Sequence, residues 1–236
     1  MTKISKRGFD TNDIRWFSEK ELIKLRKAHE EIKWLLDRDY KIETIINFVG
    51  DRYQFSTRQR DALKRSTCSS KSKILRKSKE ININELKDKI LSIDGFNLII
   101  SLEVALSGGT LIVGDDGLIR DLAGLRGTYK LIDKTDVAID YIFKFLESKK
   151  VKTVNIYLDS PVSNSGNLKI RLLENSNKYK IITNVKLVNN ADVILEKLDN
   201  VVTSDSTILD KCNSYINLSR SIIDEYVHDA ILILIS

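Results

Sequence analysis

The stretch Ile90-Leu-Ser-Ile-Asp-Gly-Phe-Asn97 decides the fold that we expect for this chain. Its first part, KILSID at residues 89–94, has the short apolar pattern of a buried strand. Apolar residues then recur at helical spacing, at Leu98, Ile99, Leu102, Ala105 and Leu106. A strand that runs directly into a helix is half of a βαβ unit, which predicts a parallel sheet.

The same alternation of strand and helix continues to the end of the chain. TLIV and LIR flank Gly114-Asp-Asp-Gly117 and predict a hairpin. VKTVNIYLD, KYKIITN, VKLV, NVVTS, YINLS and AILILI have strand patterns, and the last of these is expected to be a buried terminal strand. Between them lie the expected helices DVAIDYIFKFLES, NLKIRLLENS, ADVILEKL, DSTILDKC and SIIDEYV. The expected fold class is therefore α/β, with a doubly wound, mostly parallel sheet that has helices on both faces.

Aspartates mark the ends of three of these strand patterns. Asp94, Asp159 and Asp205 each close an apolar run, and Asp192 opens the helix ADVILEKL. Open α/β sheets place ligand crevices outside the carboxyl ends of their strands. Clustered carboxylates raise each other's pKa unless a cation lies between them. We therefore expect a Mg²⁺ or Mn²⁺ site with phosphodiester chemistry, although each aspartate could instead serve a turn or cap a helix.

The front of the chain has the pattern of a small helical module. Residues 19–37 and 42–50 keep helical spacing, and Ser56-Thr-Arg-Gln59 has the form of a capping box that opens a third, basic helix. Two short helices around a turn are typical of a helix-turn-helix, but also of any small bundle. Trp16 and Trp34 are expected to pack inside the module.

Composition shifts suggest the domain boundaries. Residues 66–80 are rich in Ser and Lys and are expected to form a solvated linker or a basic arm. We accordingly divide the chain into a helical module at residues 1–66, a linker at 67–85 and an α/β domain at 86–236.

Charge is distributed unevenly between these parts. Residues 1–80 hold 21 Lys and Arg against 12 Asp and Glu, a net +9, whereas residues 81–236 hold 18 against 21, a net −3. A basic module beside an acidic domain suggests that the former binds a polyanion, with RNA as the expected partner, and the latter a metal. General lysine enrichment is the alternative explanation.

Several classes of protein are excluded or disfavoured. Cys68 and Cys212 lie far apart and only His29 and His228 accompany them, so no zinc-binding spacing is present and all four side chains are expected to be incidental. No apolar stretch reaches the ~20 residues of a membrane helix, and no secretory signal follows the N-terminus. We expect a cytoplasmic protein that does not bind membranes.

Short motifs resemble a known class of nucleases. Ile93-Asp-Gly-Phe-Asn97 resembles the first-strand signature of PIN-like and NYN nucleases, and Leu158-Asp159 their second strand-end acid. Ala191-Asp192 and Val202-Thr-Ser-Asp205 resemble their last acidic pair. The whole chain also resembles the domain-of-unknown-function-434 family, through segments such as VGDRYQF, TRQR, LEVALSGG and RDLAG.

The PIN-like resemblance implies a metal-dependent nuclease centre. It makes Asp94, Asp159, Asp192 and Asp205 the catalytic and metal-binding carboxylates, with Asn97 orienting a water or a substrate phosphate. Glu103 and Asp121 are reserve candidates, and Asp210 is expected to point away.

Two features depart from the PIN-like pattern and are expected to bind substrate. The loop around Ser163, Asn164 and Ser165 resembles a polar nest that holds a phosphate through backbone amides. Arg120 and Arg126 are expected to clamp a second phosphate.

The favoured function is a Mg²⁺- or Mn²⁺-dependent nuclease that hydrolyses phosphodiester bonds, most simply those of RNA. The main alternative is a catalytically silent RNA- or nucleotide-binding protein with the same fold. A phosphatase acting through the Ser-Asn-Ser-Gly loop and a DNA-binding regulator acting through the front helices are weaker alternatives.

Overall fold

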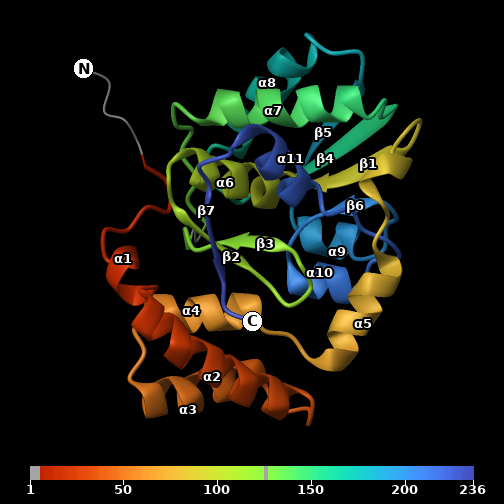
Figure 1. Ribbon diagram of the computed structural model, residues 1–236. Helices are drawn as coiled ribbons and strands as arrows, with labels where there is room; N and C mark the ends of the chain where they lie inside the picture. Colours follow the sequence, from red (N-terminus) through yellow and green to blue (C-terminus); the bar gives the residue numbers. More distant parts are fainter. Residues whose placement is uncertain (1–5, 125–126) are drawn as a thin grey trace.

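A computed structural model describes residues 6–124 and 127–236, which form two β-sheets and a set of helices (Figure 1). The first sheet has the strand order β5-β4-β1-β6, and its neighbouring strands are all parallel. Its strands are β1 (Ile90–Asp94), β4 (Thr153–Asp159), β5 (Ile182–Val188) and β6 (Val201–Val202). The expected α/β class with a mostly parallel sheet is confirmed.

Helices cover both faces of this sheet because its side chains alternate between two apolar clusters. On β4, Val154, Ile156 and Leu158 belong to the larger cluster, whereas Tyr157 belongs to a smaller one. The helices of the larger cluster are α6 (Gly95–Leu106), α7 (Thr135–Ser148), α8 (Ser165–Ser176) and α11 (Leu218–Tyr226). Those of the smaller cluster are α9 (Ala191–Leu195) and α10 (Ser206–Lys211).

The second sheet has the order β3-β2-β7. It consists of β2 (Thr110–Val113), β3 (Ile119–Asp121) and β7 (Ile231–Leu234). The expected hairpin of β2 and β3 is confirmed, and Gly117 has the positive φ of 78° that its tight turn requires. The terminal strand β7 pairs with β2 in parallel, but Ile231 and Leu234 are 45% and 52% exposed, so the expected burial of this strand is wrong.

Local strand boundaries also differ from expectation. The two strands expected over residues 178–188 form the single strand β5, because the pairing with β4 continues without a break from Ile182 to Val188. In the expected strand at residues 215–219, only Tyr215 makes isolated bridges, and a helix begins at Leu218.

The front of the chain is helical, as expected, and its helices are α1 (Asp13–Trp16), α2 (Glu19–Leu36), α3 (Ile42–Tyr53) and α4 (Thr57–Ser66). The capping box at Ser56 and Gln59 is present at the start of α4. Trp16 packs against the core of this module, but Trp34 is 56% exposed and lies against the Arg38 guanidinium instead. The helical core also includes Ile112 of β2, Leu122 directly after β3, and Ile235 near the C-terminus.

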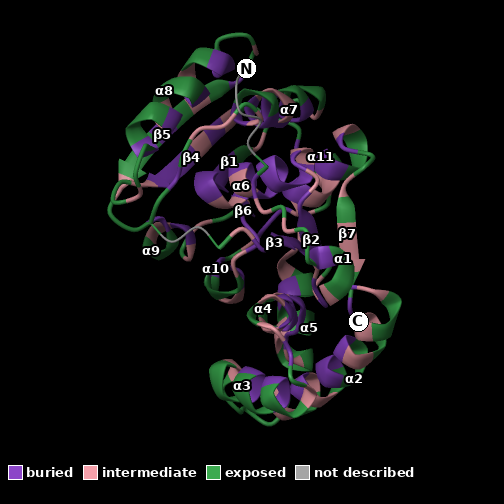
Figure 2. Ribbon diagram, turned by 90° about the vertical axis from the view of Figure 1, so that its left-hand side faces the viewer, coloured by how far each residue is buried: buried purple, intermediate pink, exposed green. Residues whose placement is uncertain are grey.

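The segment expected to be a solvated linker is a helix. Residues Ser70–Lys79 form α5, which the 3-10 turn η1 (Ile83–Glu85) follows. Arg76 of α5 is only 3% exposed, because its guanidinium binds acids of the α/β region. Figure 2 shows that α6 and the strands β1, β2 and β3 are largely buried, whereas β5, α3 and α8 expose much of their surface.

A buried histidine ties the helical module to the hairpin. His29 of α2 lies 3.1 Å through Nε2 from both carboxylate oxygens of Asp115, and both residues are buried. Burial by itself would raise the pKa of Asp115, but the hydrogen bond with His29 and the charge of His29 outweigh it and lower the pKa. The expectation that His29 is incidental is therefore wrong.

Replacing His29 tests this connection. His29→Ala leaves the Asp115 carboxylate buried without its main partner, and we expect the free energy of unfolding to fall by about 3 kcal/mol. Urea denaturation measures the change. His228→Ala is the matched control, because His228 is exposed, and its effect should stay within about 0.5 kcal/mol. Equal effects of the two substitutions would contradict a structural role for His29.

Candidate active site at the carboxyl edge of the parallel sheet

The winding of the first sheet reverses between β1 and β6. The chain proceeds from β1 to β4 and β5 in one direction, and then places β6 on the other side of β1. In open α/β sheets, ligands bind outside the carboxyl ends of the strands at such a switch point. Asp94 ends β1, and Thr203, Ser204 and Asp205 directly follow β6, so these residues occupy that position.

Strand alternation explains why acids from different elements face the same region. On β1, Leu91 and Ile93 point into the larger cluster, so Asp94 points to the opposite face, which α9 and α10 cover. Asp159 follows the same rule, because it lies two residues after Tyr157 on β4. Asp192 lies in the first turn of α9, and Asp205 precedes α10. All four aspartates thus belong to the α9/α10 side of the carboxyl edge.

Asp94 is the most buried of the four. It is buried and accepts hydrogen bonds from the Asn97 backbone N–H at 3.2 Å and from Thr203 Oγ1 at 2.9 Å. Burial raises the pKa of Asp94 to about 7, and the charges of Asp192 and Asp205 add to the rise against those two hydrogen bonds. Asp94 therefore caps α6, which was the alternative role expected for it, and it also belongs to a cluster of like charges.

The other three aspartates are more accessible. One oxygen of Asp205 caps α10 by accepting the Thr207 and Ile208 backbone N–H groups. Asp159 Oδ1 accepts the Ala191 N–H at 2.8 Å. Asn190, and not Asp192, caps α9. Asp192 is exposed and makes no hydrogen bond through its carboxylate among the described residues.

Charge coupling shows that these acids act on one another. The pKa of Asp192 is raised, first by the desolvation that nearby protein atoms impose on its exposed carboxylate and then by the charges of Asp205 and Asp159. Asp94, Asp159, Asp192 and Asp205 thus form one electrostatic group, which we call the acidic edge.

Asn97 joins α6 to the loop after β6. Its Oδ1 accepts the Ser204 backbone N–H at 2.8 Å and the Ser204 hydroxyl at 3.0 Å. Because Oδ1 is the acceptor, the amide nitrogen Nδ2 points away from Ser204 as a donor, and it has no hydrogen-bond partner among the described residues. Asn97 also lines a cavity, described below, so this donor is available to a ligand.

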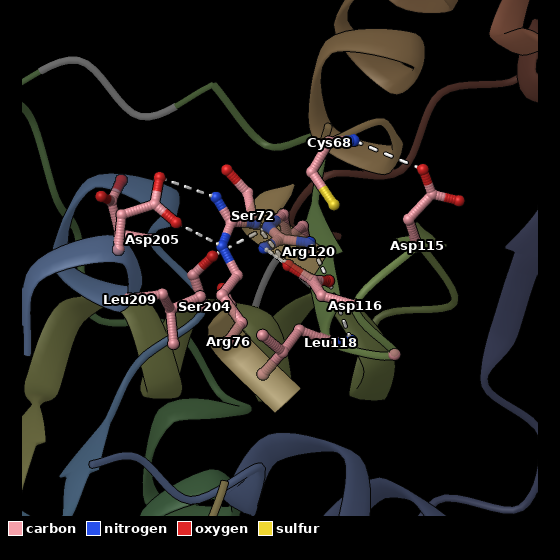
Figure 3. Close-up of polar contacts among 12 residues, drawn as sticks. Cys68, Ser72, Arg76, Asp115, Asp116, Leu118, Arg120, Ser204, Asp205 and Leu209 are labelled. Atoms are coloured by element: carbon pink, nitrogen blue, oxygen red, sulfur yellow. Dashed lines mark hydrogen bonds and ion pairs between the residues drawn. The ribbon is translucent and has the colours of Figure 1, made fainter. Parts of the chain in front are cut away.

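The Arg120 guanidinium is used in hydrogen bonds and an ion pair within the protein. It is buried, and its guanidinium donates to the Ser204 carbonyl at 2.8 Å, to the Arg65 carbonyl at 3.2 Å and to both oxygens of Asp116. Figure 3 shows Arg76 and Arg120 converging on Asp116, with Ser204 and Asp205 beside them. Burial would raise the pKa of Asp116, but Arg120 and Arg76 lower it to about 2. Arg120 therefore holds the loop of Ser204 against the end of α4, and few of its donors remain for a phosphate.

The loop before α8 is also internally bonded. Ser163 and Asn164 bond the backbone of Tyr129, at 3.0 Å and 2.7 Å respectively, and the Ser165 hydroxyl donates to the Ser160 carbonyl. These bonds fold the loop against residues 127–129 rather than presenting the three side chains to a ligand. Arg126, the other expected phosphate clamp, lies outside the described residues.

The reserve acids have structural partners. Glu103 is fully buried among Arg7, Tyr129 and Thr135, and its pKa is raised by burial. Asp121 accepts the Ala123 N–H at 2.8 Å. Asp210 does not simply point away, because it pairs with Arg76 at 2.7 Å and lines the cavity.

The acidic edge offers the oxygen donors that Mg²⁺ prefers, but not a closed cage. Across residues 6–124 and 127–236, no group of three or more His, Cys, Asp or Glu side chains is arranged to hold a metal ion. Mg²⁺ usually takes only one or two carboxylates and completes its shell with waters and substrate phosphates. The donor set therefore fits an ion that is bound together with substrate.

A cavity of about 760 Å³ connects the acidic edge to the helical module. Asn97, Ser204 and Asp205 line one side, and residues of α3, α4 and α5 with their connecting segments line the other. The sequence did not reveal this contact, because it joins Ser204 and Asp205 to residues more than 100 positions away and Asn97 to a separately predicted module. The Ser-Lys composition of residues 66–80 was the only available signal, and it pointed to a linker.

Together, the fold and the site define a class of α/β proteins with an acidic carboxyl edge and a helical module packed beside it. The chain belongs to the family described as Domain of unknown function (DUF5616), whose model matches residues 83–221. The model described as Protein of unknown function (DUF434) matches residues 24–79, so the expected resemblance to that family holds for the helical front and not for nearly the whole chain.

One relative covers most of the chain. An uncharacterized protein of Methanocaldococcus jannaschii is 37% identical over 185 residues, which are 78% of this chain and 88% of that protein. No solved structure matches the chain. No helix among the described residues is long and apolar enough to cross a membrane.

Proposed function

We propose that this protein is a divalent-metal-dependent nuclease that hydrolyses phosphodiester bonds, with RNA as its substrate and a PIN-like α/β domain as its catalytic part. The observation that carries the proposal is the position of Asp94, Asp192 and Asp205 at the switch point of the sheet, where the charges of Asp192 and Asp205 help to raise the pKa of Asp94 and the charge of Asp205 helps to raise that of Asp192. Acids whose pKa is raised by burial and neighbouring charges in a ligand crevice are typical of functional sites.

The residues of the acidic edge would divide the work. One or two of the carboxylates of Asp94, Asp192 and Asp205, together with substrate phosphate and waters, would hold Mg²⁺ or Mn²⁺, which when bound polarises a phosphate and lowers the pKa of water. The Asn97 Nδ2 donor would orient a phosphate oxygen, while Ser204 holds the amide in place. Asp159 would not be a principal metal ligand, because its Oδ1 already accepts the Ala191 N–H at the start of α9.

The strand order supports the PIN-like part of the proposal. In chain order, the sheet runs third, second, first, fourth, which is a doubly wound arrangement. The resemblance implied such a sheet with strand-end acids, and Asp94 and Asp159 do end adjacent parallel strands.

One observation favours a second candidate. The described residues form no metal cage in the absence of substrate, and this also suits a protein that binds RNA or nucleotides without cleaving them.

Asp192→Asn separates the two candidates. Because Asp192 caps no helix and is exposed, its replacement should leave folding intact. A nuclease should lose at least about 100-fold of its Mn²⁺-dependent cleavage of a labelled single-stranded RNA. Asp199→Asn is the matched control, since exposed Asp199 precedes β6 at the opposite edge of the sheet. Wild-type protein that binds the RNA but never cleaves it would establish the silent alternative.

A further inference from the structure

We propose that Arg65, Thr67 and Asn97 form a phosphate-binding subsite, which holds the backbone of a single-stranded nucleic acid beside the acidic edge. This inference rests on the proposed function, and it identifies where the substrate strand lies. All three residues line the cavity between the helical module and the carboxyl edge.

Arg65 supplies the positive charge of the subsite. It is the penultimate residue of the basic helix α4, and its side chain makes no ion pair or hydrogen bond among the described residues. The other arginines of this helix are used internally: Arg58 pairs with Asp13 at 2.7 Å, and Arg60 pairs with Asp51 at 2.8 Å. Arg65 is thus the guanidinium of α4 that is left for a ligand, and guanidinium groups match phosphate geometry.

Thr67 supplies an unused hydroxyl. The residue is only 8% exposed, and its Oγ1 has no hydrogen-bond partner among the described residues. A buried hydroxyl without a partner destabilises the fold. Because Oγ1 itself has almost no accessible surface, the Thr67 side chain must turn toward the cavity to reach a ligand. On the facing wall, Asn97 Nδ2 is a third donor without a hydrogen-bond partner in the described part of the chain.

Arg120 keeps the two walls of the subsite together. Its guanidinium donates both to the Arg65 carbonyl and to the Ser204 carbonyl, and Asn97 binds Ser204. The donors of the helical module are therefore held close to those of the α/β domain by a rigid, buried group.

The size and lining of the cavity favour a single strand. A volume of about 760 Å³ lies in the range of sites for small ligands and leaves room for nucleotide units but not for a duplex. Tyr40 lines the same cavity and is 57% exposed, so it offers a ring on which a base can stack.

Binding without cleavage tests the subsite. Fluorescence polarisation of a labelled single-stranded RNA in EDTA measures affinity while hydrolysis is prevented. We expect Arg65→Gln to weaken binding about 10-fold and to lower the salt dependence by about one phosphate contact. Thr67→Val should weaken binding about 5-fold. The Thr67→Val protein should unfold at the same or a higher temperature, because the substitution removes the buried hydroxyl that has no partner.

Matched controls exclude general effects. Arg26→Gln removes an exposed arginine of α2, and Ser101→Ala removes another buried hydroxyl without a partner in α6, and neither residue lines the cavity. Both control proteins should bind as wild type does. Unchanged affinity in Arg65→Gln and Thr67→Val would overturn the subsite, even if the aspartate variants lose cleavage. Equal affinity for a duplex of the same sequence would also contradict it. Weakened binding in a protein that never cleaves RNA would support the subsite and overturn only the nuclease.

Discussion

Asp94→Asn is expected to abolish cleavage while it stabilises the folded protein at neutral and alkaline pH. The substitution removes a buried carboxylate of the acidic edge, and the lost metal ligand should lower cleavage by at least about 100-fold. Asparagine is a good N-cap, so α6 should keep its start. The opposite signs of the two effects distinguish a functional residue from a purely structural one.

The gain in stability follows from the pKa of Asp94, which burial and the neighbouring acids raise from 3.8 to about 7. In that interval the folded protein retains a proton that the unfolded chain has released. The group therefore contributes most to stability below about pH 4, and its contribution falls as the pH rises towards 7. Above pH 7 the wild-type protein should be less stable than Asp94→Asn by up to about 4 kcal/mol.

Urea denaturation of both proteins from about pH 4 to about pH 8 measures this difference, and Asp199→Asn provides the control for a simple change of charge. The difference between wild type and Asp94→Asn should grow with pH and shrink when Mn²⁺ is added to the wild type. A constant difference across this range would show that Asp94 ionises normally. A variant that still cleaves RNA would remove Asp94 from the active site.

Arg76→Ala is expected to destabilise the protein by about 3–5 kcal/mol. Arg76 is buried, and it binds Asp116 at 2.6 Å and Asp210 at 2.7 Å. Asp116 would keep Arg120, but the buried cluster would lose one of its two positive charges. Because Arg76 anchors α5, the cavity wall should loosen as well.

Chemical denaturation and RNA binding measure the two consequences of Arg76→Ala. Lys77→Ala is the control on the same helix, because the Lys77 side chain is 78% exposed, and its effect should be within about 0.5 kcal/mol. A loss below about 1 kcal/mol for Arg76→Ala would show that the buried pairs do not stabilise the docking of α5.

The sequence predicted the elements of this fold much better than their contacts. Alternation and helical spacing identified β1, α6, β4 and the capping box at Ser56, because these signals lie within a few neighbouring residues. The strand-end positions of Asp94 and Asp159 followed from the same local patterns.

Long-range pairing could not be predicted in this way. Residues 70–79 look like a solvated Ser-Lys segment, and they fold as α5 because Arg76 meets acids 40 and 134 positions away. His29 appeared incidental for the same reason, since Asp115 lies 86 residues further along the chain. Arg120 was expected to clamp a phosphate, and its actual bonds to Asp116, Ser204 and Arg65 depend on how the two halves of the chain pack.

The central claim is that the acidic edge binds a divalent cation for phosphodiester hydrolysis. Calorimetric titration of Mn²⁺ into wild type and into Asp94→Asn/Asp205→Asn protein, with labelled RNA incubated in parallel, tests it most directly. We predict saturable binding and cleavage in the wild type, with both lost in the double variant. Failure of the wild type to bind Mn²⁺, or equal binding by both proteins, would contradict the metal site.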